Sequence, residues 1–255
     1  MNLNLYSPLA NEYKNNAQKI RILTENWVYQ NIYCPNCGKS IKTYKNNKPV
    51  ADFYCTECNE DYELKSKKDS IGKKIIDGAY STMIERLQSS SNPNFFFLIY
   101  NKNNLNVFNF LVVPKYFFVP EIIEKRKPLS KNAKRAGWVG CNILISAIPD
   151  SGKIFYIKNG QIENKNKVME SWKKITFLKQ VKNIKTKSWL IEIITCIEKL
   201  NKKHFTLNDL YAFENILKQK YPNNNNIKAK IRQQLQILRD NNYLTFIDRG
   251  KYKLN

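Results

Sequence analysis

The sequence predicts an α/β domain that contains a four-cysteine metal site, followed by a small helical domain that ends in a β-hairpin. Apolar runs typical of strands alternate with helical stretches over residues 1–181, and two Cys-x2-Cys pairs interrupt them. Residues 182–255 instead show the periodicity of packed helices. The 255 residues suffice for two ordinary domains, and we place the boundary between residues 181 and 182.

The elements of the first domain follow from their apolar patterns. Residues 10–29 carry apolar side chains at helical spacing, and two apolar, aromatic runs at residues 94–100 and 107–113 suit buried strands. The shorter elements that we expect are strands at residues 50–54, 62–67 and 153–158 and helices at residues 79–88 and 167–178. Together these elements predict helices packed around one mixed sheet.

The second domain follows a polar, basic stretch at residues 179–187, which we interpret as a linker. Thr206 and Asp209 have the spacing of a capping box, which indicates a helix that begins after Thr206. Helical patterns cover three segments: residues 188–200, the stretch after Thr206 to about residue 221, and residues 227–241. Strand patterns at residues 243–247 and 251–254 then flank a turn. Three helices followed by a hairpin are typical of a winged helix-turn-helix domain.

The strongest single signal is the cysteine spacing. Cys34 and Cys37 form one Cys-x2-Cys pair, and Cys55 and Cys58 form a second. Four thiolates complete a tetrahedron around Zn²⁺ and leave no open position for water, so we expect a structural zinc site. The remaining two cysteines, Cys141 and Cys196, stand alone in apolar surroundings and are expected in the core.

A second candidate site combines Asp52 with the segment Glu63-Leu64-Lys65. Residues two apart on a strand share a face, so Glu63 and Lys65 point the same way, and Asp52 joins them if its strand pairs with theirs. Two carboxylates and the strand carbonyl of Leu64 are hard oxygen ligands that suit Mg²⁺. The Cys55 pair lies in the connection between the two strands, so zinc would fix the distance between the carboxylates.

Asp-x(n)-Glu-x-Lys is the pattern of the PD-(D/E)xK nucleases, in which Asp52, Glu63 and Lys65 would be the catalytic residues. A chance Glu-x-Lys is common in a lysine-rich chain, and a strand of surface ion pairs is the alternative interpretation. Ala51 occupies the place of the proline that usually precedes the aspartate. The only histidine, His204, lies in the second domain as an expected solvated loop residue, which excludes histidine-based catalytic sites from the first domain.

The charge balance favours a nucleic-acid partner. The formal net charge is +22, with 28 basic and 15 acidic residues in the first domain and 15 basic and 6 acidic residues in the second. A composition bias towards Lys, Asn and Ile is the alternative explanation. No apolar stretch is long enough for a membrane span, and the N-terminus lacks a signal-peptide pattern, so we expect a cytoplasmic protein with no membrane partner.

Two segments have the residues for contacts with DNA. The first is a basic loop without acidic residues that ends at Trp138; its basic residues are Lys125, Arg126, Lys127, Lys131, Lys134 and Arg135. Such a loop suits phosphate contacts and stacking on a base, or else it is a solvated loop anchored by a core tryptophan. The second is the last helix and its hairpin, where we expect DNA contacts from Lys228, Arg232, Gln233, Gln236, Arg249 and Lys251 rather than a solvated polar face.

With these residues in place, the sequence resembles the DpnI-like family of methyl-directed type II restriction endonucleases. The stretches that carry the resemblance run in order across the chain: QKIRILTENWVY (18–29), YCPNCG (33–38), ADFYC (51–55), ELKSKK (63–68), NPNFFFL (92–98), RAGWVGCN (135–142), IRQQLQILRD (231–240) and RGKY (249–252). The loops at residues 39–48, 69–76 and 220–227 differ from the family's pattern.

The resemblance implies a PD-(D/E)xK restriction-endonuclease-like domain with an inserted zinc site, joined to a winged helix. It implies Mg²⁺-dependent cleavage of both DNA strands at GATC sites that carry N6-methyladenine, by a monomer that reads the site with both domains. By the same resemblance Trp138 contacts the methylated adenines. Two alternatives stay open: an endonuclease of this fold that acts on unmodified or mismatched DNA, and a zinc-ribbon, winged-helix regulator without enzymatic activity.

Overall fold

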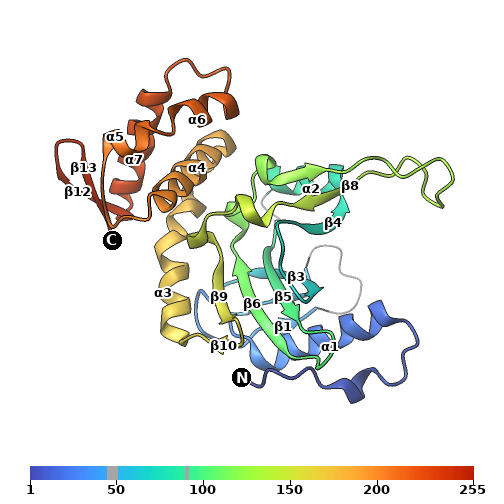
Figure 1. Cartoon of the computed structure of the whole chain (residues 1–255). Helices are drawn as coiled ribbons and strands as arrows, with labels where there is room; N and C mark the ends of the chain where they lie inside the picture. The colour runs from blue at the N-terminus through green and yellow to red at the C-terminus, as the bar shows by residue number, and fades with distance from the viewer. Residues whose placement is uncertain (45–50, 90–91) are drawn as a thin grey trace. The chain divides into compact units, whose positions relative to one another are not determined.

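Residues 1–44, 51–89 and 92–255 are described by a computed structural model (Figure 1). Their contacts divide the chain into two compact units, one of residues 1–147 and 151–173 and the other of residues 148–150 and 174–255. Val50, with which the first predicted strand begins, lies outside the described residues. The domain boundary at residues 181 and 182 stays a prediction.

A seven-stranded sheet forms the centre of the first unit. Its strands follow the order β1 (Lys42–Thr43), β2 (Phe53–Tyr54), β3 (Asp61–Lys68), β5 (Asn94–Tyr100), β6 (Val107–Val113), β9 (Ile154–Lys158) and β10 (Gln161–Ile162). β3 and β5 run parallel, and the other neighbouring strands are antiparallel. All seven residues of β5 are buried, as its continuous apolar run predicts.

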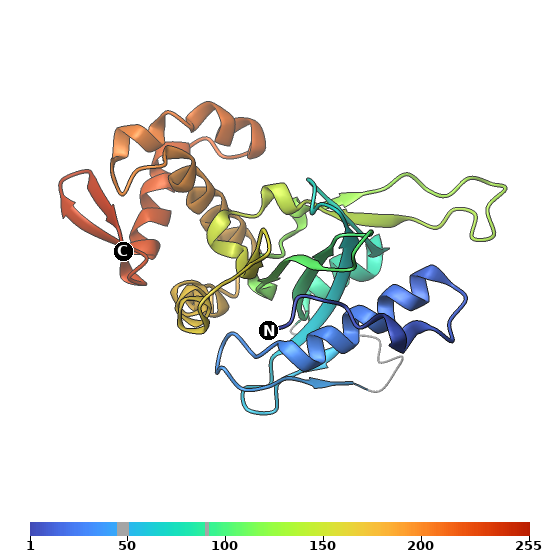
Figure 2. The same ribbon diagram turned by 60° about the horizontal axis from the view of Figure 1, so that its bottom comes forward.

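The two faces of this sheet differ in chemistry. On one face the rings of Tyr62 and Phe96 stack at 4.5 Å, and Trp27 of helix α1 (Asn16–Asn31) packs against Phe110 at 5.4 Å. Figure 2 shows α1 running alongside the sheet. On the other face Glu63 is paired with Phe95 and Lys65 with Phe97 in the register of β3 and β5. Glu63 and Lys65 therefore project away from the face that α1 covers.

The prediction of a single sheet is wrong, because the first unit contains a second, three-stranded sheet. This sheet has the order β4 (Ile75–Ala79), β8 (Gly140–Ile143) and β7 (Ile123–Lys125), and helix α2 (Tyr80–Gln88) follows β4 directly. Its strands are three to five residues long and two of them contain glycine, so their sequence has too few alternating apolar positions to indicate strands. Helix α3 (Lys165–Ile175) follows β10, and the last residues of the helix expected at 167–178 form a 3₁₀ helix instead.

The second unit has the elements of a winged helix-turn-helix domain. Its helices are α4 (Ile184–Leu200), α5 (Leu207–Tyr211), α6 (Glu214–Lys220) and α7 (Ile227–Asp240), and its sheet has the order β11 (His204–Thr206), β13 (Lys251–Leu254) and β12 (Leu244–Asp248). The predicted capping box is present, with Thr206 and Asp209 each bonded to the other's backbone N–H. Ile231, Leu235 and Leu238 of α7 and Cys196 of α4 are buried.

The expected starts of the helices at residues 10–29 and 188–200 are wrong by several residues, and asparagine caps explain both. The side chain of Asn15 accepts hydrogen bonds from the N–H groups of Ala17 and Gln18, so α1 begins at Asn16 rather than at residue 10. The side chain of Asn183 likewise accepts from the N–H of Thr186, and α4 begins inside the predicted linker. The helix expected from Thr206 to residue 221 is divided into α5 and α6 at residues 212–213.

Short 3₁₀ helices connect several of these elements. They cover Ser7–Ala10, Lys115–Phe117, Pro120–Ile122, Ile145–Ala147, Asp150–Gly152 and Thr176–Gln180. Among the helices of the described ranges, none combines the length and the apolar character that a bilayer span requires.

Candidate metal centre and active site

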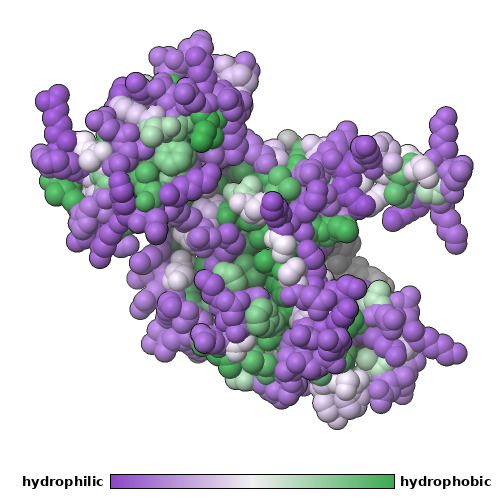
Figure 3. All heavy atoms as spheres, viewed as in Figure 1, coloured by the Kyte–Doolittle hydropathy of each residue, from purple (hydrophilic) through white to green (hydrophobic). Residues whose placement is uncertain are grey.

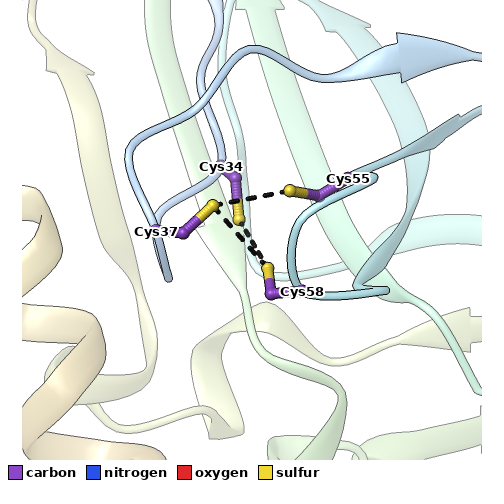
Figure 4. A group of neighbouring side chains, drawn as sticks. All are labelled: Cys34, Cys37, Cys55 and Cys58. Carbon is purple, nitrogen blue, oxygen red and sulfur yellow. Dashed lines mark hydrogen bonds between the residues drawn. The ribbon is translucent and has the colours of Figure 1, made fainter.

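The four predicted zinc ligands converge on one point. Cys34 and Cys37 follow the end of α1, and Cys55 and Cys58 lie in the connection between β2 and β3 (Figure 4). The sulfur atoms lie within 4.8 Å of one another, with Cys34–Cys58 at 3.4 Å, Cys37–Cys55 at 3.5 Å and Cys37–Cys58 at 3.8 Å. Because a tetrahedral Zn²⁺ with bonds of about 2.3 Å separates its sulfurs by about 3.8 Å, the cluster fits this ion.

Two similar turns present these sulfurs. In the first, the N–H of Gly38 donates to the carbonyl of Cys34 at 2.8 Å, and in the second the N–H of Asn59 donates to the carbonyl of Cys55 at 3.0 Å. Gly38 and Asn59 both have positive φ angles, of 73° and 54°. Glycine and asparagine are the residues that adopt this conformation most readily, so the sequence supplies the right residue immediately after each cysteine pair.

Tyr62 connects the cysteine cluster to the central sheet. Its hydroxyl lies 3.0 Å from the sulfur of Cys34, and its ring is fully buried in β3. Burial raises the pKa of the Cys34 thiol well above its ordinary value, and the hydrogen bond from Tyr62 opposes this effect. A hydroxyl that donates to a metal-bound thiolate fixes the orientation of that ligand. The residue that follows Tyr62 is Glu63, so the cluster and the candidate catalytic strand share one rigid segment.

Glu63 and Lys65 lie together on β3, as their spacing predicts. The Lys65 Nζ atom is 2.6 Å from Glu63 Oε1, and it also lies over the ring of Phe95, 5.9 Å from the centroid. Two residues that the sequence did not single out complete the cluster. Asp77 Oδ1 of β4 lies 2.5 Å from Lys65 Nζ, and Arg86 Nη1 of α2 lies 3.2 Å from Glu63 Oε2. The result is a row of four alternating charges.

Asp52 approaches the same segment from the edge of β3. Its N–H donates to the carbonyl of Tyr62 at 3.0 Å, and its Oδ2 atom accepts the N–H of Leu64 at 2.7 Å. The N–H and C=O of one strand residue point to the same edge, so the carbonyl of Leu64 faces the side on which Asp52 lies. The structure thus brings Asp52 to the backbone between Glu63 and Lys65. Within the described ranges, the cysteines alone form a group of three or more potential ligand residues within 4.8 Å.

The electrostatics of this cluster keep Lys65 charged. Burial lowers the pKa of Lys65, but the nearby carboxylates of Glu63 and Asp77 outweigh burial and raise it overall. Burial also raises the pKa of Glu63, which the ammonium of Lys65 partly offsets. An ammonium group at this position stabilises negative charge that develops next to it, whereas it does not accept a proton from water.

Asp77 and Arg86 were missed because no local pattern in the sequence links them to β3. The strand that carries Asp77 is only five residues long and was not expected, and Arg86 lies in a correctly predicted helix without any motif around it. The one local signal is the acidic side chain of Asp77 between two isoleucines and a glycine.

The predicted basic loop is an extended arm between β7 and β8 (Figure 1). Its two sides are joined near its base, where the N–H of Leu129 donates to the carbonyl of Trp138 at 2.9 Å. Lys134 and Arg135 are exposed, and most of the arm has a hydrophilic surface in the view of Figure 3. This side of the arm therefore has the charge and exposure that phosphate contacts require.

Trp138 lies at the base of the arm and is half-buried. The guanidinium of Arg135 lies over its ring, 4.6 Å from the centroid. A side chain at Gly140 would approach the same ring to within 2.8 Å, so only glycine leaves room for this ring position. The predicted alternative of a tryptophan in the core does not describe this environment, because Trp138 retains exposed surface.

The predicted DNA-contact residues of the second unit are all exposed. They are Lys228, Arg232, Gln233 and Gln236 on α7 and Arg249 and Lys251 in the hairpin of β12 and β13. Arg232 Nη1 donates to the hydroxyl of Tyr211 at 2.7 Å, and Lys228 forms an ion pair with Glu214 at 3.4 Å. His204 is exposed but lies in β11 rather than in a loop. The N-terminal half of the polar face of α7 is thus held by residues of α5 and α6.

Comparison with known families assigns both units. Residues 1–181 match the Dam-replacing family, and residues 185–254 match the Dam-replacing HTH domain. The first match includes the cysteine cluster, the row of four charges around Lys65 and the basic arm, and the second includes α7 and the hairpin. Both matches run in the order in which the two units occur.

Proposed function

The chain belongs to the Dam-replacing family of DpnI-like restriction endonucleases, and we propose that it cleaves both DNA strands at GATC sites that carry N6-methyladenine, using Mg²⁺. The observation that carries this proposal is the position of Asp52 against the backbone of Leu64, between Glu63 and Lys65. This arrangement, on a mixed sheet, is the one that a PD-(D/E)xK nuclease domain needs. The proposal also includes a monomer as the active form.

In this proposal Asp52, Glu63 and the carbonyl of Leu64 hold the magnesium ion. Their oxygen atoms are the hard ligands that Mg²⁺ prefers. When bound, the ion supplies Lewis-acid stabilisation of the phosphate oxygens and a water molecule of lowered pKa. Lys65 places its ammonium group beside the attacked phosphate, where it stabilises the charge that builds up on the phosphoryl oxygens. Asp52 also orients β3 through its hydrogen bond to Leu64.

The four cysteines would hold a structural zinc ion that fixes the connection between β2 and β3. Asp52 lies directly before β2 and Glu63 lies in β3, so the geometry of this connection sets the separation of the two carboxylates. All four zinc positions are filled by thiolates, which leaves no place for a substrate. Zinc in this protein would therefore act on the reaction only through the fold.

We propose that both units recognise the methylated GATC site in the DNA. In the first unit Lys134 and Arg135 would contact phosphates and Trp138 would cover the methyl group of the modified adenine. In the second unit the polar face of α7 would enter the major groove, where arginine pairs with guanine and glutamine with adenine. Arg249 and Lys251 of the hairpin would contact the backbone. Two reading units allow one monomer to recognise a symmetric site.

Digestion of one plasmid prepared with and without adenine methylation at GATC tests the proposed function. We expect double-strand breaks in the methylated plasmid only, with Mg²⁺ present, because the buried methyl groups add favourable contact that the unmethylated site lacks. The measurement is the fraction of linear fragments against time on a gel.

The remaining outcomes of this digest contradict the proposal in different ways. Equal cleavage of both plasmids would indicate an endonuclease without methyl dependence. DNA binding without cleavage under Mg²⁺, Mn²⁺ or Co²⁺ would instead indicate a non-enzymatic regulator.

Replacement of Trp138 by alanine is expected to reduce the preference for methylated sites by roughly 30-fold. One buried methyl group contributes about 1 kcal/mol, and two strands double this value to about 2 kcal/mol, which corresponds to that factor. The measurement is the ratio of cleavage rates on methylated and unmethylated duplexes. Lys134→Ala serves as the control, because loss of a phosphate contact weakens binding to both duplexes equally. An unchanged ratio in the tryptophan variant would remove Trp138 from methyl recognition.

A further inference from the structure

The ammonium of Lys65 is shared between two carboxylates, of which the proposed mechanism uses only one. We propose that Asp77 is a positioning residue of the cleavage reaction, which holds the Lys65 ammonium in place when Glu63 turns to the metal. This inference rests on the proposed function and adds to it a residue from a different sheet. The Nζ atom of Lys65 and the Oδ1 atom of Asp77 lie 2.5 Å apart, in direct ion-pair contact.

The local structure of β4 aims Asp77 at this position. Asp77 is paired with Cys141 of β8, and the register then shifts between Asp77 and Ala79, so Gly78 forms a bulge. A bulge redirects the neighbouring side chain, and such irregularities are common beside active sites. The side chain of Asp77 is only 7% exposed, less than those of Glu63 and Lys65 at 18% and 21%. A carboxylate this deeply buried requires a charged partner, and Lys65 is that partner.

The order of charges explains why a second carboxylate is needed. Along the row, Arg86 contacts Glu63, Glu63 contacts Lys65, and Lys65 contacts Asp77. When Glu63 uses an oxygen atom for the metal, its contact with Lys65 weakens, and a lysine held by Glu63 alone would lose its position. Because Asp77 contacts the same Nζ atom from β4, the ammonium keeps one fixed acceptor in both states.

Asp77 contacts Lys65 through its Oδ1 atom, so we assign it a role that acts through this lysine. The Mn²⁺ affinity measured in the test below distinguishes this role from that of a metal ligand.

The test compares Asp77→Asn with Glu124→Gln, a variant that removes a carboxylate from β7 of the same sheet but outside the charged row. In single-turnover cleavage of a methylated duplex we expect Asp77→Asn to lower the rate about 10- to 100-fold. The affinity for the duplex in Ca²⁺ and the affinity for Mn²⁺ without DNA, measured by calorimetry, should stay unchanged. Glu124→Gln should cleave at the rate of the parent protein.

A double-mutant cycle separates positioning from a merely structural role. If Asp77 acts through Lys65, Asp77→Asn should cause no further loss of rate in a Lys65→Ala background. If Asp77→Asn caused the same loss of rate in the parent protein and in the Lys65→Ala variant, the inference would be overturned. A weaker affinity of Asp77→Asn for Mn²⁺ would also overturn it, because it would indicate that Asp77 is a metal ligand. If circular dichroism shows that Asp77→Asn folds poorly, Asp77→Glu provides the second variant. We expect Asp77→Glu to recover part of the cleavage rate. A cleavage rate of Asp77→Glu no higher than that of Lys65→Ala would overturn the inference.

Failure of this inference and failure of the proposed function give different results. Parent-level cleavage by Asp77→Asn, with the parent protein active, would overturn the inference alone. Absence of cleavage by the parent protein under any divalent ion would overturn the proposed function and this inference with it.

Discussion

Asp52→Asn is expected to reduce the rate of DNA cleavage by at least about 10³-fold while the protein still binds methylated DNA. A metal ion that stabilises transition-state charge contributes several kcal/mol, and each 1.36 kcal/mol corresponds to about tenfold in rate. Asparagine removes the charge of a proposed metal ligand but keeps an oxygen atom that accepts the N–H of Leu64, a bond of 2.7 Å in this structure. The fold of the strand edge should therefore survive.

The measurement is single-turnover cleavage together with a binding titration in Ca²⁺. Asp69→Asn is the matched control, since it makes the same chemical change directly after β3, away from the charged row. Asp69 is exposed and has a φ of 65°, a conformation that asparagine accepts, so the control should cut at the parent rate. Cleavage by Asp52→Asn within about tenfold of the parent rate would contradict the assignment of Asp52 as a metal ligand.

The sequence predicted those structural features that depend on the spacing of residues within one short segment. Two Cys-x2-Cys pairs were enough to predict the four-cysteine cluster, because each pair forms one turn and the turns need only meet. Glu63 and Lys65 were placed on one face by the two-residue period of a strand, and their contact of 2.6 Å agrees with it. The strands β5 and β6 were predicted with their observed bounds. A short, continuous apolar run between polar residues is typical of a strand that is buried in a sheet, so its ends mark the ends of the strand.

Prediction failed where a function depends on contacts between distant segments. Asp77 reaches Lys65 through a bulged strand of five residues, and neither the strand nor the bulge has a periodic signal. The hydroxyl of Tyr62 reaches Cys34 across 28 residues, which no spacing rule includes. The ends of the helices were misjudged for a different reason, since the capping side chains of Asn15 and Asn183 decided them in a chain that is rich in asparagine.

The cysteine cluster also influences the positions of residues outside its own two turns. The connection that holds Cys55 and Cys58 is flanked by Asp52 on one side and by Glu63 on the other, and Tyr62 binds the cluster directly. A change in the cluster therefore moves the two proposed metal ligands relative to each other. Loss of zinc is thus expected to affect both the stability and the activity of the first unit.

Cys34→Ser is expected to abolish zinc binding, to unfold a large part of the first unit and to eliminate cleavage. Cys34 is fully buried, and its sulfur contacts both Cys58 and Tyr62. Structural zinc in small domains contributes about 10–16 kcal/mol at pH 7, which matches or exceeds the roughly 5–15 kcal/mol by which a whole domain is stable. Serine is a poor zinc ligand, and the remaining three thiols, of which that of Cys55 is buried, would be left without a complete metal site.

Zinc content by mass spectrometry and calorimetric unfolding measure this effect, and the two units provide an internal comparison. The transition of the first unit should move to much lower temperature or disappear, whereas that of the second unit should keep its midpoint. Cys196→Ala is the matched control, because Cys196 is a buried cysteine of α4 without a place in the cluster. This control should keep its full zinc content and change only the second transition. If Cys34→Ser lacked zinc and yet unfolded with the parent's first transition, the cluster would not stabilise the fold, and the role assigned to it in aligning Asp52 with Glu63 would be wrong.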